Sequence, residues 1–201
     1  MAGIGLSKPY VAIYAFDGED VSYSNGGTVG KAVTLDLSLE DGNSNILYGD
    51  NGPAEIDNKF AGGELTLTTT ELLAEEMSKI LGLTEIALSI PGMSTASASE
   101  IQFGDAQNTP YVGFGAIAKK MIDGDIKYVG IVYPKVMFQN MSETLNTQGE
   151  TIEWQTPEIS AQISRDDTAA HNWKRISSPL DAEADALLYI QYCLGGEVAS
   201  E

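Results

Sequence analysis

Several segments of the chain alternate apolar and polar residues with a period of two. Segment 32–40, AVTLDLSLE, is the clearest case, and segments 63–68 and 158–164 repeat the alternation. This pattern is typical of a β-strand with one buried face and one solvated face. The sequence therefore predicts half-buried strands here. Their polar rows include Asp36, Ser38, Glu40, Glu64, Thr66 and Thr68.

Two neighbouring segments, 109–121 and 125–138, carry apolar residues on both faces and are rich in β-branched and aromatic residues. Asp123-Gly124 stands between them, and a tight hairpin turn favours this pair because Gly accepts a positive φ. We therefore predict a central hairpin that is covered on both sides. Segments 9–16 and 150–156 are predicted as further strands.

A helical period of 3.6 residues appears in two places. In segment 68–82 the apolar residues recur at three- and four-residue spacing, with Thr68 and Glu71 as a predicted capping box and Gly82 as the stop. A second helix is predicted after Ser178, with Pro179 in its first position.

The order of these elements is three strands, a helix, four or more strands and a terminal helix. It predicts a mainly β (α+β) fold, an antiparallel β-sandwich or partial barrel flanked by an α-helix, with a C-terminal helix added. The length of 201 residues fits one domain over residues 1–201. Irregular stretches are predicted at 41–58 and 92–109, and a polar connection as long as the first is unusual in a compact domain.

Composition narrows the function classes. Hydrophobic residues make up 43% of the chain, as in a globular protein, and 29 acids against 11 bases give a net charge of −18. This balance argues against wrapping nucleic acid and against binding an anionic membrane surface. No signal peptide or membrane span is expected from the apolar runs. The single Cys excludes an internal disulfide and suits a reducing compartment.

No group of residues matches a catalytic or metal-binding motif. His171 is the only histidine and has no partner for a paired site, and Cys193 lies on the apolar side of the last helix. The acids within 50–57 lack the ligand ladder of a calcium loop, and the glycines of 113–115 lie in a strand rather than before a helix. We therefore expect no enzyme activity, no cofactor and no metal.

An ordered set of segments carries a family resemblance. The segments are IGLSKPYVA near the start, LYGDNGPAE, FAGGELTLTTTEL, PYVGFGAIAKKMIDGDIKYVGIVYPKVMF and GETIEWQTPEISAQI. In this order they resemble the major tail tube proteins of long-tailed bacteriophages, closest to a family common in phages of Gram-positive bacteria. The resemblance spans residues 3 to about 175 and assigns no role to the terminal helix. The C-terminal extension is taken as 166–201.

The resemblance implies a structural virion protein with the tail tube fold. Subunits of that family form hexameric rings that stack into a hollow tube, which holds the tape measure protein and conducts the genome into the host. The implied partners are other copies of the chain, the tape measure protein, and the tail terminator and distal tail proteins. DNA would pass through the lumen without specific binding. The implied location is the virion tail, with the host cytoplasm during assembly and no membrane.

The resemblance also implies roles for particular residues. Loop 41–59 would reach onto the next ring, with apolar anchors and polar register residues; the alternative is a loop that covers its own domain. The polar rows at 36–40 and 64–68 are candidates for the lumen, or else ordinary solvated faces. The predicted inter-ring residues are Tyr48, Asp50, Asn51, Glu55, Ile56 and Asp57.

General physics is consistent with such an assembly. Exposed strand edges are an aggregation hazard unless they are paired, and a ring of subunits pairs them. An acidic conduit would repel DNA rather than retain it. The alternative function is a monomeric β-sandwich binding module for carbohydrate or protein. Such a module needs an exposed aromatic platform, and the nine Tyr and two Trp form no alternating row.

Overall fold

A computed structural model describes most of the chain. The described residues are 2–40, 45–49, 52–57, 60–94, 98–105, 107–142, 147 and 155–196, with the backbone alone for 45–49 and 52–57. Within them the protein is mainly β, with two helices. The antiparallel β class expected from the alternating segments is confirmed.

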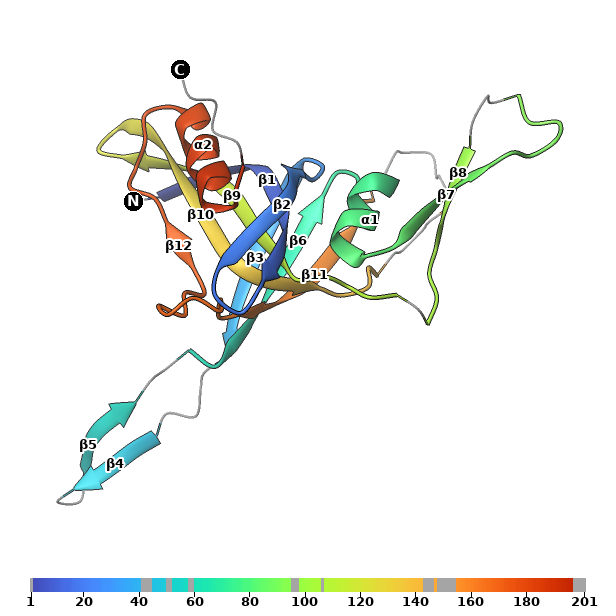
Figure 1. Ribbon diagram of the computed structural model, residues 1–201. Coiled ribbons are helices and arrows are strands. Elements are labelled where there is room, and N and C mark those ends of the chain that lie inside the picture. Colours follow the sequence, from blue (N-terminus) through green and yellow to red (C-terminus); the bar gives the residue numbers. More distant parts are fainter. Residues whose placement is uncertain are drawn as a thin grey trace.

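One eight-stranded antiparallel sheet forms the body of the molecule (Figure 1). Seven strands follow the order β2-β1-β9-β10-β11-β6-β3, and β12 pairs with β10 off this path. The sheet does not close into a barrel. Its two end strands, β2 and β3, do not pair with each other among the described residues. The strands are β1 (Ala2–Phe16), β2 (Val21–Thr28), β3 (Ala32–Glu40), β6 (Gly62–Thr69), β9 (Val112–Ile122), β10 (Asp125–Phe138), β11 (Glu158–Ser164) and β12 (Arg175–Ile176).

Strand β10 connects the two halves of the sheet. It pairs with β9 along most of its length, while its last residues, Lys135 to Phe138, pair with Ser164 to Ala161 of β11. The predicted β9–β10 hairpin turn is confirmed: Ile122 pairs with Asp125, and Asp123 and Gly124 have φ of 54° and 92°. Two consecutive positive φ values are the signature of a type I′ turn.

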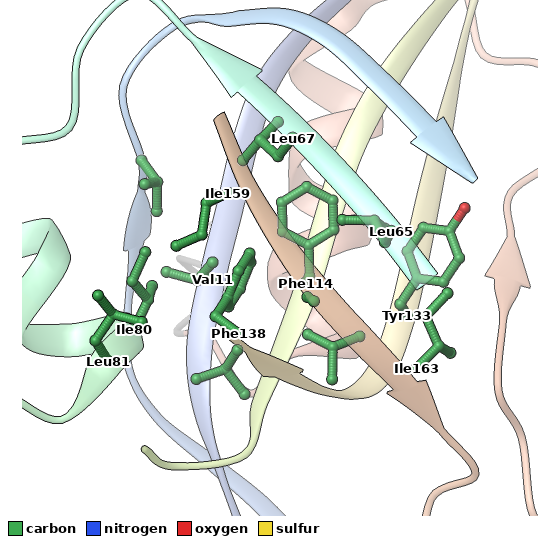
Figure 2. Packing of buried hydrophobic residues seen from close by; sticks show 14 of the residues in the cluster. Val11, Leu65, Leu67, Ile80, Leu81, Phe114, Tyr133, Phe138, Ile159 and Ile163 are labelled. Atoms are coloured by element: carbon green, nitrogen blue, oxygen red, sulfur yellow. The ribbon is translucent and has the colours of Figure 1, made fainter. Parts of the chain in front are cut away.

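The main core lies inside the bend of the sheet (Figure 2). Side chains from β1, β9 and β10 meet those of β6 and β11, and α1 (Ala74–Leu81) closes one end with Ile80 and Leu81. All of the labelled side chains are nearly or fully buried, so this cluster holds the two halves of the sheet together. They are Val11, Leu65, Leu67, Ile80, Leu81, Phe114, Tyr133, Phe138, Ile159 and Ile163.

A second core lies on the opposite face of β1, β9 and β10, beneath α2 (Glu183–Cys193). Ala186, Ile190 and Cys193 of α2 are buried there against Ile117 and Val132. The predicted hairpin β9–β10 is therefore covered on both faces, as expected. The buried thiol at Cys193 also agrees with its expected structural position.

The first helix begins later than predicted. Thr68 and Thr69 belong to β6, where they pair with Glu158 and Ala32, so Thr68 and Glu71 form no capping box. Instead Glu76 caps the helix: its carboxylate accepts the Leu73 N–H at 2.8 Å. The predicted stop is confirmed, since Gly82 has a left-handed φ of 66°.

The second helix also begins later than predicted, at Glu183 rather than after Ser178. The preceding residues extend the sheet edge along β10: Ser177 N–H donates to Gly130 O, and Leu180 exchanges two 2.8 Å backbone hydrogen bonds with Tyr128. This pairing holds the segment extended through Pro179, and the helix starts only after it.

Six strands in the structure were not predicted: β2, β12, β7 (Thr84–Leu88), β8 (Ala98–Gln102) and the two strands of the hairpin within 41–59. The irregular stretch predicted at 92–109 thus contains β8, which among the described strands pairs only with β7. The strand predicted at 150–156 lies mostly outside the described residues. None of the helices in the described chain is long and apolar enough to cross a membrane.

Candidate assembly surfaces

A continuous polar face covers the outer side of β3, β6 and β11. Successive side chains of each strand point to opposite faces of the sheet. Leu65, Leu67 and Ile159 therefore point into the core, while their neighbours in the chain point outward. All six polar residues predicted from the alternating rows lie on this face, because the register pairs Asp36 with Thr66, Ser38 with Glu64, Glu40 with Gly62, and Thr34 with Thr68.

Strand β11 adds a third row that sequence reasoning did not include. Glu158 pairs with Thr68, Ser160 with Thr66, and Gln162 with Glu64. Segment 158–164 alternates in the sequence as clearly as the other two. Alternation alone does not say which strand is its neighbour, so only the register adds Glu158, Ser160 and Gln162 to the face. We call these three rows the polar face.

Hydroxyl groups link the rows of the polar face. Thr34 Oγ1 lies 2.9 Å from Thr68 Oγ1, and Thr66 Oγ1 lies 3.2 Å from Ser160 Oγ. Cross-strand pairs of this kind contribute up to about 1 kcal/mol each to the stability of a sheet. The hydroxyl pairs fix the spacing of the rows while leaving the carboxylates free to face solvent.

The polar face is anionic. Its carboxylates are those of Asp36, Glu40, Glu64 and Glu158, and the three strands contain no Lys or Arg. Each of these carboxylates is paired across strands with a hydroxyl, an amide or a glycine rather than with another acid. Since like charges directly opposite each other destabilise a sheet, this register lets the face stay negative at little cost.

Both ends of the sheet are open edges. Strand β3 pairs only with β6, and β2 pairs only with β1, among the described strands. Val33 and Leu39 of β3 are each 46% exposed, so the edge next to the polar face also carries apolar surface. Long, partly apolar edges of this kind can pair with another chain.

The predicted contact loop 41–59 contains a hairpin, β4 (Asn45–Gly49) and β5 (Gly52–Asp57). The expectation of an irregular stretch over 41–58 is therefore wrong. Ile46 pairs with Ile56 and Leu47 with Glu55, and the hairpin forms its own two-stranded sheet. Figure 1 shows it projecting beyond the ends of β3 and β6.

The structure places four of the six predicted contact residues in this hairpin. Tyr48 lies in β4, and Glu55, Ile56 and Asp57 lie in β5, while Asp50 and Asn51 fall outside the described residues. A two-stranded hairpin alone in water is marginally stable at best. Such an element is expected to gain its stability from a surface outside its own sheet.

A second hairpin, β7–β8, extends from the opposite side of the molecule beside α1 (Figure 1). It also forms a two-stranded sheet of its own. Ile101 packs partly against the main core, while Ile86, Ile90 and Met93 remain between 37% and 50% exposed. The sequence signal for it is the Ile-Pro-Gly-Met run at 90–93, typical of a turn between two strands.

The described residues hold no candidate reaction centre. His171 is exposed and its Nδ1 lies 3.2 Å from the Asp166 carbonyl oxygen, a local contact within one loop. Cys193 is buried in the second core. No group of three or more His, Cys, Asp or Glu among these residues could hold a metal ion. What the surfaces offer chemically is association: a charged face, two open edges and two projecting hairpins.

No protein-family model matches this chain, and no curated protein matches it significantly.

Proposed function

We propose that this protein is a structural subunit that self-assembles into stacked rings, forming the tail tube of a long-tailed bacteriophage. The observation that carries the proposal is the polar face: one side of three adjacent strands bears four carboxylates, several hydroxyls and no cation. Double-stranded DNA carries one negative charge per ~1.7 Å of its axis. A lumen built from this face would let DNA slide past without binding it.

The open sheet supports the same proposal. The sheet has free edges at β2 and β3 among the described strands, and pairing of these edges with neighbouring copies would remove both edges at once. The number of six copies in a ring, and the sandwich-like tail tube fold, come from the family resemblance of the sequence.

The β4–β5 hairpin supports the stacking of rings. It projects from the edge where β3 and β6 end, and it pairs with no other described strand. In the proposed tube it lies on a subunit of the next ring, with Tyr48 and Ile56 as apolar anchors. The tape measure protein occupies the lumen before DNA does, and the tail terminator and distal tail proteins close the two ends.

The alternative, a monomeric module that binds carbohydrate or protein, has less support. A carbohydrate platform needs several coplanar aromatic rings on one surface. The most exposed aromatic side chains of the described residues belong to separate elements or loops. They are Phe16, Phe103, Tyr111 and Tyr192.

Electron microscopy of the purified protein tests the proposal. At high concentration, with or without a tape measure fragment, we expect rings or tubes of uniform width with a central channel. A fresh dilute sample serves as the reference for the free subunit. A protein that stays monomeric under all of these conditions would count decisively against a tail tube.

A further inference from the structure

Strand β2 carries an asparagine followed directly by a glycine at its free edge. Asn25 and Gly26 are both exposed, and among the described strands β2 pairs with β1 alone. Asn25 has a φ of 51°, in the left-handed region that Asn adopts more readily than most residues. Among the asparagines whose side chains the structure describes, this is the only one that precedes a glycine.

The register of β2 interrupts the ladder at this pair. Val11 pairs with Gly27, and Ile13 pairs with Ser24, so the two residues 25 and 26 together stand opposite Ala12. Two residues opposite one form a β-bulge, in which the extra residue is left without a partner in the ladder. The backbone between Asn25 and Gly26 is therefore less constrained than the rest of the strand.

Packing requires the glycine of this pair. A Cβ at Gly26 would lie 2.1 Å from Tyr10 Oη, which is too close for two atoms that are not bonded. Tyr10 itself is only 5% exposed and belongs to the second core. Position 26 accepts no larger side chain, so the fold itself maintains the Asn-Gly pair.

A cavity of about 510 Å³ lies beside the pair, between β2 and α1. Its two charged residues, Glu75 and Lys79, have opposite signs, and neither forms an ion pair with another described residue. Lys79 Nζ would be 3.2 Å from a Cβ at Gly27, so the ammonium lies over the backbone next to Gly26. The lining residues are Ile13, Asn25, Gly26, Glu75, Ser78 and Lys79.

The cavity also offers a place for water. Among the described residues, Ser78 Oγ is the one buried polar side-chain atom without a hydrogen-bond partner. A space of this size that has several polar groups can hold water. Asn25 thus has a carboxylate, an ammonium and a water site in the same cavity, and these groups can accept and donate protons.

We propose that Asn25 is a site of self-modification. The Gly26 backbone nitrogen attacks Asn25 Cγ, the bond between Cγ and Nδ2 breaks, and ammonia leaves as a succinimide ring closes. Glu75 takes the proton of the Gly26 amide, and Lys79 gives a proton to the leaving nitrogen. Water then adds to one of the two ring carbonyl groups and opens the ring to aspartate or isoaspartate. Water is the only other reactant.

The product changes the free edge of β2. Both forms replace a neutral amide by a carboxylate, which adds one negative charge to a chain of net charge −18 and faces Lys79. Isoaspartate also inserts an additional carbon atom into the backbone. The consequence for assembly rests on the proposed function, in which this edge pairs with a neighbouring copy: modified subunits should pair less well.

Peptide mapping by mass spectrometry tests the modification. The full-length protein is held at pH 8 and 37 °C and sampled over several weeks. The peptide with Asn25 should gain about 1 Da, at least about tenfold faster than the peptides with Asn108, Asn140 or Asn172. The other Asn-Gly pair, 51–52, begins at a residue outside the described part of the chain, and it is read on a separate peptide.

Substitutions in the cavity test the part played by its charged groups. Glu75→Gln and Lys79→Gln should each slow the gain in mass about threefold, because each removes a group that transfers a proton. Glu71→Gln and Lys31→Gln are the matched controls, since both residues are exposed and neither lines the cavity. Circular dichroism should show that all four variants are folded.

Two results would overturn the modification site. One is an Asn25 peptide that changes no faster than those of the other asparagines, and the other is an equal rate in the cavity variants and their controls. A lasting loss of ammonia without gain of water, with the peptides of Asn25 and Lys79 joined, would also overturn it. Such a product would be an amide bond between the two side chains.

The effect on assembly is measured separately from the modification. Asn25→Asp should form fewer rings or tubes than wild type in electron microscopy, and equal assembly would contradict the effect on the edge. The change in mass is read on the free subunit, so it does not depend on ring formation. A protein that gains mass at Asn25 but never forms rings would contradict the proposed function and leave the modification site standing.

Discussion

At the scale of single residues, Asp167 joins the C-terminal segment to the sheet. Its Oδ2 accepts hydrogen bonds from Lys135 Nζ at 2.6 Å and from Tyr14 Oη at 2.7 Å, and its N–H donates to Tyr14 Oη at 3.0 Å. The Lys135 ammonium and then the Tyr14 hydroxyl lower the pKa of this carboxyl. Burial raises the pKa of Tyr14 to about 12, so its phenol remains a donor at neutral pH.

This network predicts a pH-dependent contribution to stability. A carboxyl whose pKa is lower in the folded state contributes its stability above the unfolded value, about 3.9, and loses it as the pH falls through the folded value. Asp167→Asn should therefore lower the free energy of unfolding by about 1 kcal/mol at pH 7, because the site is partly exposed. The difference from wild type should shrink below pH 4.

Urea unfolding across pH 2–8 measures both effects. Asp20→Asn is a matched control, since Asp20 is exposed and no described residue donates a hydrogen bond to its carboxylate. If the two variants show the same pH profile, the carboxylate of Asp167 does not stabilise the fold through Lys135 and Tyr14.

At the scale of elements, glycines let α2 approach the sheet. A Cβ at Gly115 would lie 2.5 Å from Ile190 Cγ2, and one at Gly130 would lie 2.7 Å from a ring carbon of Tyr189. Contacts this short are not tolerated, so the helix packs directly on a bare strip of backbone. The glycines that the sequence showed within 113–115 are thus explained by packing.

Gly115→Ala should destabilise the protein by about 1–3 kcal/mol, because an added methyl group forces the helix away from the strands. The measurement is the midpoint of thermal or urea unfolding. Gly3→Ala is the control, since a Cβ there meets nothing within 4 Å. An equal change in the unfolding midpoint of the two variants would mean that α2 can shift without cost. The close approach of the helix to the strands would then contribute nothing to stability.

The β4–β5 hairpin should be dispensable for folding and required for stacking. Strands β3 and β6 already pair at Glu40 and Gly62, so residues 41–44 and 58–61 suffice to connect them after removal of 45–57. This shortened chain should keep its unfolding midpoint within experimental error, because the hairpin pairs with no other described strand.

Electron microscopy of the shortened chain is the decisive measurement. We expect single rings or free subunits in place of long tubes. Tubes of normal length would show that the hairpin has no part in ring stacking, and a loss of folding would show that it belongs to the domain itself.

At the scale of the whole molecule, the distribution of charge matters more than its total. The polar face is anionic throughout, because its three strands carry Asp36, Glu40, Glu64 and Glu158 and no Lys or Arg. Asp36→Lys, Glu64→Lys and Glu158→Lys together should turn the face into a DNA-binding surface. Its affinity for duplex DNA should fall steeply with salt.

A variant with the same net charge provides the control. Glu19→Lys, Asp20→Lys and Glu75→Lys replace three exposed acids away from the polar face. In fluorescence anisotropy at low salt, the polar-face variant should bind at least about tenfold more tightly than this control. Equal affinities would mean that the position of the charge is unimportant, which would remove the main support for the lumen.

Some features could be predicted because they depend on neighbouring residues alone. The Asp123-Gly124 turn, the Gly82 stop and the alternation of segment 32–40 are local patterns, and the structure contains all three. The starts of the two helices were mispredicted for the opposite reason. Thr68 and Leu180 both lie where the local sequence favours the start of a helix. However, Thr68 pairs with Glu158 and Leu180 pairs with Tyr128, and this strand pairing holds both residues extended.

By itself, the sequence determined the mainly β fold class and the polar rows, because alternation of apolar and polar residues is a local pattern. Tertiary structure alone decided that Glu158, Ser160 and Gln162 join Asp36 and Glu64 on one face. It also decided that the β7–β8 hairpin projects beside α1, away from α2. Register and long-range packing fix these relations, and they arise between residues far apart in the chain.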